Sequence, residues 1–371
     1  MRKLKVAISI NTSWNIYNFR MGIVKTLLEA DHEVIAIAPL DNYSGYLKDI
    51  GCSIESLEVD NTGSNPITDI KLCWAYYRIY KRVNPDIILH FTIKPNIYGT
   101  LAAKRLNIPV INNVSGLGTV FLNTNIVSFM AKQLYRLAFR KAELVFFQNE
   151  MDKQDFLNHV NISEDRVDLL PGSGINLNEF VPLKKENSPT FNFLMVSRIL
   201  IDKGIYEYVD AAKLLKSQLE NVSFQLLGEL DENHKRGIPA KELKSWQEDG
   251  IIEYLGYTDT VEDVIKNSDC VVLPSYREGT PRTLLEGAAM GKPLIATDVP
   301  GCNHVVNDGV NGFLCKVKNS ESLANAMQKM YGLEPEERTS FGKSSRAIIE
   351  EIFDEHIVVQ KYMRSIIELT N

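Results

Sequence analysis

Short apolar runs alternate with amphipathic stretches from one end of the 371-residue chain to the other. A run such as Ile87–Leu89 is apolar at every position, which is typical of a strand buried on both faces of a sheet. The stretches between the runs, for example Arg20–Ala30, place apolar residues at helical spacing. This alternation predicts βαβ units and an α/β fold built on parallel sheets.

The runs give the positions of the expected strands and helices. Expected strands of the first half are Val6–Ile10, Glu33–Ala38, Ser53–Leu57, Ile87–Phe91, Val110–Asn112, Leu144–Gln148 and Val167–Leu170. Those of the second half are Phe191–Val196, Val222–Leu227, Ile251–Leu255, Cys270–Leu273, Leu294–Thr297 and Gly312–Cys315. The expected helices include Arg20–Ala30, Ile70–Val83, Ile97–Leu106, Ile126–Lys141 and a last, interrupted helix from Glu336 to Leu369.

The pattern restarts after a polar, proline-containing segment, Lys184–Pro189, which predicts a linker. The chain length favours two domains. We therefore expect an N-terminal Rossmann-like domain over residues 1–185 and a C-terminal Rossmann-like domain over 186–350. A final helix, 351–371, is expected to pack back on the first domain. Two doubly wound domains of this kind bind ligands at the carboxyl edges of their sheets, which predicts a central cleft.

Composition limits where the protein works and what it binds. Apolar residues make up 44% and charged residues 24%, as in ordinary globular proteins. The odd number of cysteines, five, favours a reducing cytoplasm over a disulfide framework. No apolar stretch reaches the ~18 residues of a membrane span, and no signal peptide is expected. We expect a cytoplasmic protein, peripheral on the inner face of the plasma membrane if a membrane is involved.

The net charge of −6 is unevenly distributed. Residues 1–185 carry 21 Lys and Arg against 18 Asp and Glu, and residues 186–371 carry 20 against 29. An acidic second half argues against nucleic-acid binding, which needs a basic surface. The mildly basic first half could face a negatively charged surface.

The segment Ser275–Pro293 contains the strongest chemical signal. It follows the expected strand Cys270–Leu273, and Gly279 permits a tight turn there. We expect Thr280 to be the N-cap and Pro281 the first residue of a helix that ends at Gly291. The amide groups at the start of such a helix suit a phosphate. Glu278 and Glu286 would then lie near what the phosphate carries, and a carboxylate can accept bonds from both ribose hydroxyls. A capped helix with two solvated glutamates is the alternative.

A second signal, Val196–Gly204, follows the first strand of the second half. Arg198 can bind phosphate oxygens with two hydrogen bonds, and Lys203 adds a compact positive charge. Two cations beside a diphosphate would stabilise the charge that develops as a glycosidic bond breaks. The alternative interpretation is that Arg198 and Lys203 are two solvated cations in a surface loop.

Together these motifs resemble the GT-B retaining glycosyltransferases of family 4, and the likeness extends over nearly the whole chain. Pro171–Asn176 is similar to the interdomain turn of that family. The resemblance implies that Arg198 and Lys203 bind the donor diphosphate, that Glu278 binds the transferred sugar, and that Gly279 and Thr280 lie at the phosphate. It further implies Glu286 on the ribose, Tyr257 at the base, a UDP-sugar donor, and no cofactor or metal. The sequence has no Asp-x-Asp motif and no His/Cys cluster at ligand spacing.

The acceptor side departs from the family pattern. Asn11–Asn15 occupies a loop that often holds a Gly-Gly pair, and Asn112–Gly118 replaces a segment that often holds a histidine. Asn15, Asn113, Ser115 and Gly116 are candidates for the acceptor side. His90 could approach the cleft, although a packed, hydrogen-bonded core histidine is the simpler interpretation.

The sequence of residues 275–282 and 297–302 resembles that of a bacterial subgroup whose members extend undecaprenyl-diphosphate-linked sugars for capsule, O-antigen or protein glycans. Members often add N-acetylgalactosamine or a related hexose. A lipid-linked acceptor would bring the protein to an anionic membrane surface. The expected helices Ile70–Val83 and Ile126–Lys141 are basic, and the first is also aromatic, which suits such a surface. An ordinary core face backed by a solvated basic face would give the same pattern. Their relevant residues are Trp74, Tyr76, Tyr77, Arg78, Tyr80, Lys81, Arg82, Val127, Met130, Lys132, Leu134, Arg136, Leu137, Ala138 and Arg140.

Other functions remain as alternatives. A GT-B-like nucleotide-sugar epimerase would release or epimerise the donor without an acceptor, and the Glu278–Glu286 motif disfavours it. A transferase with a soluble acceptor is a second alternative. A nicotinamide dehydrogenase is disfavoured because no G-x-G-x-x-G follows Val6–Ile10. A non-catalytic relic is disfavoured because Arg198, Lys203, Glu278 and Glu286 are all present.

Overall fold

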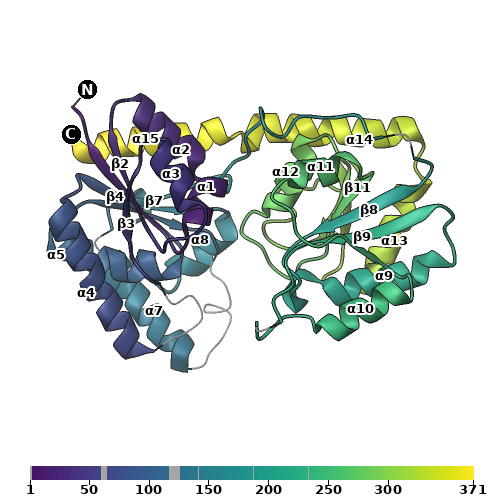
Figure 1. The fold of residues 1–371 in the computed structure, drawn as a ribbon, viewed down its shortest axis with the longest axis horizontal. Helices are drawn as coiled ribbons and strands as arrows, with labels where there is room; N and C mark the ends of the chain where they lie inside the picture. The colour runs from purple at the N-terminus through teal and green to yellow at the C-terminus, as the bar shows by residue number, and fades with distance from the viewer. Residues whose placement is uncertain (1, 60–64, 117–125, 141, 187, 233) are drawn as a thin grey trace. The chain divides into compact units, whose positions relative to one another are not determined.

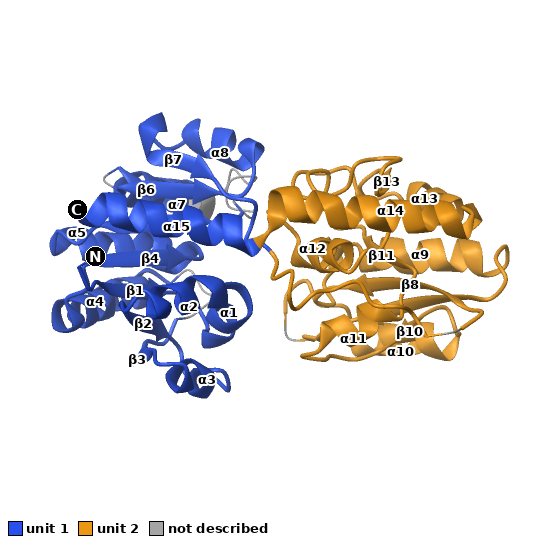
Figure 2. Cartoon of the chain, turned by 90° about the horizontal axis from the view of Figure 1, so that it is seen from above, with its two compact units in different colours: residues 1–174, 355–371 blue, residues 175–354 orange. Residues whose placement is uncertain are grey.

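The fold was analysed in a computed structural model, which describes all residues except 1, 60–64, 117–125, 141, 187 and 233. The chain forms two compact units, residues 1–174 with 355–371 (unit 1) and residues 175–354 (unit 2) (Figure 2). Each unit is a parallel sheet with helices on both faces (Figure 1), so the predicted pair of Rossmann-like α/β domains is confirmed.

Unit 1 has strands in the order β3-β2-β1-β4-β5-β6-β7. The strands are β1 (Lys5–Ser9), β2 (Glu33–Ala38), β3 (Ser53–Ser56), β4 (Ile87–Phe91), β5 (Val110–Val114), β6 (Leu144–Phe147) and β7 (Val167–Leu169). The helices are α1 (Ser13–Phe19), α2 (Met21–Glu29), α3 (Ser44–Asp49), α4 (Pro66–Val83), the π-helix η1 (Pro95–Gly99), α5 (Thr100–Arg105), α7 (Ile126–Phe139), α8 (Glu150–Leu157), η2 (Glu164–Arg166) and α15 (Glu355–Thr370).

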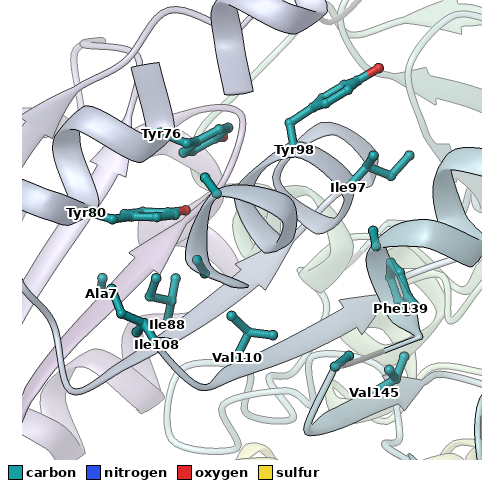
Figure 3. Close-up of a cluster of buried hydrophobic side chains, with 14 of the residues drawn as sticks. Ala7, Tyr76, Tyr80, Ile88, Ile97, Tyr98, Ile108, Val110, Phe139 and Val145 are labelled. Carbon is teal, nitrogen blue, oxygen red and sulfur yellow. The ribbon is translucent and has the colours of Figure 1, made fainter. Parts of the chain in front are cut away.

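Alternate strand residues of unit 1 fill two separate cores, which explains the continuous apolar runs. Ala7, Ile88 and Val110 lie in register on one face and pack beneath Tyr76 and Tyr80 of α4 (Figure 3). The residues of opposite parity, such as Ile8 and Leu89, pack on the other face against α2 and α15. A strand buried on both faces has no position for a solvated polar side chain.

The C-terminal helix α15 is part of unit 1. Its Tyr362 packs against Phe91 and Phe146, with ring centroids 5.9 and 5.0 Å apart, and its hydroxyl accepts a hydrogen bond from Asn113 Nδ2 at 2.9 Å. No helix among the described ranges is long and apolar enough to span a bilayer.

Unit 2 has strands in the order β10-β9-β8-β11-β12-β13. The strands are β8 (Phe191–Val196), β9 (Val222–Leu227), β10 (Glu253–Tyr254), β11 (Cys270–Leu273), β12 (Leu294–Thr297) and β13 (Gly312–Cys315). The helices are η3 (Ile201–Lys203), α9 (Ile205–Lys216), α10 (Ala240–Glu248), α11 (Val261–Lys266), α12 (Arg282–Ala289), α13 (Ser320–Gly332), α14 (Pro335–Ile348) and the π-helix η4 (Ile349–Phe353).

The units divide at Gly174/Ile175, earlier than the boundary expected after residue 185. The segment 175–185 belongs to unit 2 because Ile175 N donates to Phe353 O at 2.9 Å and Arg346 Nη1 donates to Phe180 O at 2.7 Å. The polar stretch Lys184–Pro189 is therefore a surface connection inside unit 2, with Asn187 outside the described residues. The turn at the true boundary uses two glycines with positive φ, Gly172 and Gly174.

Candidate active site

Both motifs follow neighbouring strands at the centre of the unit 2 sheet. Loop 197–204 follows β8, and loop 274–281 follows β11, which pairs directly with β8. The chain proceeds from β8 to β9 on one side of the sheet and reaches β11 on the other, so the strand order reverses here. Ligands of doubly wound folds bind at the carboxyl ends of the strands at such a reversal. We refer to this place as the β8–β11 edge.

The two loops are held together by backbone contacts. Tyr276 N donates to Asp202 O at 2.9 Å, and Ser275 Oγ donates to the same oxygen at 3.2 Å. Gly204 makes the approach possible, because its φ is +80° and a Cβ there would lie 2.1 Å from Pro274 O. Only glycine fits that conformation and spacing.

Lys203 and Glu278 meet at the β8–β11 edge. Lys203 Nζ donates to Glu278 Oε1 at 2.5 Å, and both side chains are largely buried. A charged hydrogen bond in a partly desolvated place is stronger than one at the surface. The structure thus brings together two of the residues that the sequence indicated, one from each motif.

Helix α12 begins one residue later than the sequence suggested. Pro281, with φ −73° and ψ 115°, is the N-cap, and no side chain caps the helix, so the expectation that Thr280 is the cap is wrong. Thr283 Oγ1 instead donates to Val196 O at 2.9 Å and fixes the first turn to the end of β8. Gly279 and Thr280 lie directly before this uncapped helix start, where an anion would find amide donors.

Glu286 lies one turn into α12 and is buried. Its Oε1 accepts a hydrogen bond from Arg282 Nε at 3.0 Å. Burial raises the pKa of the Glu286 carboxyl, and the neighbouring Arg282 guanidinium partly opposes that rise. Sequence reasoning missed the role of Arg282, although its spacing of four residues from Glu286 on a helix is the signal that could have revealed it.

Arg198 and Tyr257 are the more exposed candidates. Arg198 lies two residues after the end of β8, is exposed, and forms no ion pair among the residues that the structure describes. Tyr257 follows β10, is exposed, and donates its hydroxyl hydrogen to Asp259 Oδ1 at 2.6 Å. Its loop is tied to the β8–β11 edge through Gly228, whose N donates to Gly256 O at 2.7 Å. A Cβ on Gly228 would lie 1.7 Å from Ser197 O.

Tyr276 and Glu207 also support the edge, and sequence reasoning did not single them out. Tyr276 donates to Glu207 Oε1 at 2.8 Å, and the Lys318 ammonium lies 4.8 Å from the centre of its ring. Burial raises the pKa of the Tyr276 hydroxyl, and the Glu207 carboxylate raises it further. Because Tyr276 lies two residues before Glu278, this contact helps to fix the Glu278 loop.

The acceptor-side candidates lie in unit 1, at the carboxyl ends of β1 and β5. Asn15 is in the first turn of α1, where its Nδ2 donates to Asn11 Oδ1 at 2.9 Å. Asn113 is buried, and its Oδ1 has no hydrogen-bond partner among the described atoms. Ser115 and Gly116 follow β5, with Ser115 exposed. The rest of the segment expected there, 117–118, lies outside the described residues.

His90 is a core residue, as the simpler interpretation expected. It is fully buried, and its Nε2 and Nδ1 lie 2.8 Å from Tyr80 Oη and 3.0 Å from Asn112 Oδ1. Burial lowers the pKa of His90 to about 3, so the imidazole is neutral at physiological pH. All five cysteines are free thiols. Among the described residues, no three His, Cys, Asp or Glu side chains gather in a way that could hold a metal ion.

Two protein families match the sequence, one on each half. Residues 5–149 match the family described as Glycosyl transferase 4-like, and residues 178–348 match Glycosyl transferases group 1. The N,N'-diacetylbacillosaminyl-diphospho-undecaprenol alpha-1,3-N-acetylgalactosaminyltransferase of Campylobacter jejuni is 30% identical over 368 residues, which cover 94% of this chain and 95% of that protein. The UDP-Gal:alpha-D-GlcNAc-diphosphoundecaprenol alpha-1,3-galactosyltransferase of Escherichia coli is 27% identical over 286 residues, 71% of each chain.

Solved structures share the fold over the full length. A glycosyltransferase of Rickettsia africae superposes with a TM-score of 0.82 at 21% identity and covers 100% of this chain and 99% of its own. HepE of Anabaena, in complex with UDP-glucose, gives 0.80 at 19% identity, with 98% and 100% covered. The chain therefore belongs to the group 1, family 4-like glycosyltransferases of the GT-B fold.

Proposed function

We propose that this enzyme transfers a hexose or N-acetylhexosamine from a UDP-sugar to an undecaprenyl-diphosphate-linked saccharide, with retention of anomeric configuration, during assembly of a surface polysaccharide or glycan. The C. jejuni and E. coli relatives are both named as transferases that act on a diphospho-undecaprenol-linked sugar, and the first aligns over nearly the whole chain. The enzyme would work at the cytoplasmic face of the plasma membrane.

One observation supports the donor site above all others. The charged pair of Lys203 and Glu278 lies at the β8–β11 edge beside an uncapped helix start. A diphosphate at the start of α12 would compete with Glu278 for the Lys203 ammonium. Release of that pair would leave the Glu278 carboxylate available to the hydroxyls of the transferred sugar. Donor binding and the placement of Glu278 are then one event.

The other donor contacts follow from the chain around this pair. Arg198 is exposed beside β8 and would bind the diphosphate with its planar guanidinium. Gly279 and Thr280 would offer groups to the phosphates, and Glu286 would accept hydrogen bonds from the ribose hydroxyls. Tyr257, on the loop after β10, would lie against the base. Arg282 would keep the Glu286 carboxylate oriented through the bond that it already makes.

Charge stabilisation is the main chemical task of these residues. Cleavage of the bond between sugar and diphosphate places negative charge on the departing phosphate. Arg198 and Lys203 would stabilise that charge, which is where preorganised cations contribute most. In a front-face reaction the departing phosphate oxygen would take the proton from the attacking acceptor hydroxyl, so no separate base is required. Because two side-chain cations balance the diphosphate, we propose that no metal ion takes part.

The proposal is tested by donor binding and transfer together. UDP-, GDP- and ADP-sugars are compared for thermal stabilisation of the protein, and the best binder is then assayed with a lipid-linked acceptor. Arg198→Ala is expected to lose transfer by ~10²-fold or more. Lys213→Ala, which removes an exposed cation of the same unit, is the matched control and should keep full activity. Near-normal transfer by Arg198→Ala would refute the assigned role, and epimerised or hydrolysed donor with no glycosylated acceptor would refute the transferase.

A further inference from the structure

Helices α4 and α7 of unit 1 expose large apolar side chains to solvent. On α4 these are Ile67, Ile70 and Trp74, which are 66%, 62% and 62% exposed. Their spacing of three and four residues places them on one face of the helix. On α7 they are Phe129, Met130 and Leu137, which are 62%, 50% and 61% exposed. We call these six residues the apolar stripe. Each helix exposes three large apolar side chains within a few turns, which differs from the scattered single exposures that need no explanation.

The apolar stripe is distinct from the core faces of the same helices. Tyr76 and Tyr80 of α4, which the sequence offered as membrane-facing aromatics, are buried in the core (Figure 3). On α7 the core positions are Tyr135, Ala138 and Phe139. The basic and aromatic pattern seen in the sequence therefore combined residues from the buried face and the exposed face of each helix. Only the exposed face is available to a partner.

Both helices lie on one side of the unit 1 sheet, because their buried residues belong to the same core and α5 contacts both. Helix α4 follows β3 and helix α7 comes after β5, and both strands are parallel to the rest of the sheet. A helix that follows a parallel strand starts at the carboxyl edge of the sheet. Ile67, Ile70, Phe129 and Met130, in the first turns, thus lie toward the edge that carries the acceptor-side candidates.

Positive charge accompanies the apolar stripe. Helix α4 carries four exposed cations, Lys71, Arg78, Lys81 and Arg82. Its one acidic residue, Asp69, is buried and paired with Lys94 at 2.8 Å. Helix α7 carries Lys132 and Arg136 and contains no Asp or Glu. These helices are cationic although the whole chain has a net charge of −6.

We infer that the apolar stripe enters the headgroup and outer acyl region of an anionic bilayer while the cations around it bind the lipid phosphates. Exposed apolar side chains bordered by Lys and Arg match this partner in both respects, whereas a protein partner would not require the excess of one charge sign. This orientation would bring the acceptor-side edge of unit 1 to the lipid surface. The inference rests on the proposed lipid-linked acceptor, and it names the side chains that enter the bilayer.

Trp74 gives a direct test. The chain has three tryptophans. Trp246 is buried, Trp14 is half-buried, and Trp74 is exposed. Vesicles of equal parts phosphatidylcholine and phosphatidylglycerol with brominated acyl chains are expected to quench the fluorescence of the protein. Trp74→Phe should lose most of that quenching while it still sediments with the vesicles. Undiminished quenching in Trp74→Phe would overturn the inference.

Two variants separate the apolar and the electrostatic parts. Ile70→Ser/Phe129→Ser is expected to lower the partition coefficient of the protein between vesicles and water by on the order of 100-fold, both at low salt and in 0.5 M salt. Arg78→Gln should lower it about fivefold on anionic vesicles at low salt only. Leu214→Ser/Val310→Ser, which removes two exposed apolar side chains of unit 2, is the control and should bind as the wild type does.

The remaining outcomes assign failure to one claim or the other. Transfer to a saccharide on a short, water-soluble alkyl diphosphate should be unchanged in Ile70→Ser/Phe129→Ser. Wild-type protein that transfers sugar but neither binds nor is quenched by vesicles would refute the inserted surface alone. Protein that inserts but transfers nothing would refute the proposed function alone. A wild-type dimer that Ile70→Ser/Phe129→Ser converts to monomers, by sedimentation velocity, would assign the apolar stripe to a second copy and overturn the inference.

Discussion

Gly301 is expected to control the position of Glu278 from outside the motif. It lies in the loop between β12 and β13, with a φ of +85°. A Cβ at this position would lie 2.3 Å from Gly279 O and 2.7 Å from Glu278 O. Ordinary contacts of a Cβ begin at about 3.4 Å. Gly301→Ala must therefore move the Glu278–Gly279 backbone, or its own loop, by about 1 Å.

A displacement of that size is large for a reacting site. Misplacement by about 1 Å can cost about 10²-fold in rate. We expect Gly301→Ala to lower kcat/KM for transfer by about that factor. The unfavourable φ alone adds a stability cost of about 1–2 kcal/mol. Steady-state transfer and urea unfolding, measured on the same preparation, separate the two effects.

Gly309 supplies the matched control, because its φ is +72° and a Cβ there would meet nothing within 4 Å. Gly309→Ala should show a similar loss of stability with normal transfer. If Gly301→Ala keeps full activity, or if Gly309→Ala loses as much, the reasoning that close packing at Gly301 positions Glu278 is refuted.

Three further predictions concern charge. Because burial raises the pKa of Glu286, its carboxylate should protonate at a higher pH than an ordinary glutamate, and the affinity for uridine should weaken as pH falls from 8 to 5. Glu286→Gln should bind uridine weakly, with an affinity that does not depend on pH. A variant whose affinity still falls with pH as the wild type's does would contradict this. His90 has a folded pKa of about 3 against about 6.5 when unfolded, so its stabilising contribution is full above pH 6.5 and is lost as pH falls, by about 2 kcal/mol at pH 5. Urea unfolding of His90→Gln should lack that part of the pH dependence, while the exposed His304→Gln should retain it. Transfer should persist in excess EDTA because Arg198 and Lys203 supply the positive charge, and activity that EDTA abolishes and Mg²⁺ restores would show that a metal takes part.

The positions of the central strands were predictable because strands such as β4, β11 and β12 are buried at every residue and therefore appear as continuous apolar runs. Cys270–Leu273 and Leu294–Thr297 were predicted to the residue. The edge strand β10 is shorter than expected, Glu253–Tyr254, since Ile252 packs in the core without joining the ladder. The start of α4 was missed by four residues, although Asn65 and Pro66 form an N-cap and first-turn proline that the sequence displays.

Contacts between residues far apart in the chain could not be predicted from local pattern. The unit boundary depends on the bond between Ile175 and Phe353, whereas the polar segment Lys184–Pro189 looked like a linker only because it is solvated. At the site, the motifs identified Lys203 and Glu278 as candidate residues. They did not predict that the two side chains, 75 positions apart in the chain, form a hydrogen bond. Neither the bond between Tyr276 and Glu207 nor the packing of Gly301 leaves a periodic signal.

A structure of the protein with bound UDP would show directly whether the β8–β11 edge binds the donor diphosphate. The diphosphate is expected to lie at the start of α12 within hydrogen-bond distance of Arg198 and Lys203. Lys203 should have left Glu278, and the ribose hydroxyls should bond to Glu286. A diphosphate bound away from both cations, with the Lys203–Glu278 pair intact, would contradict this.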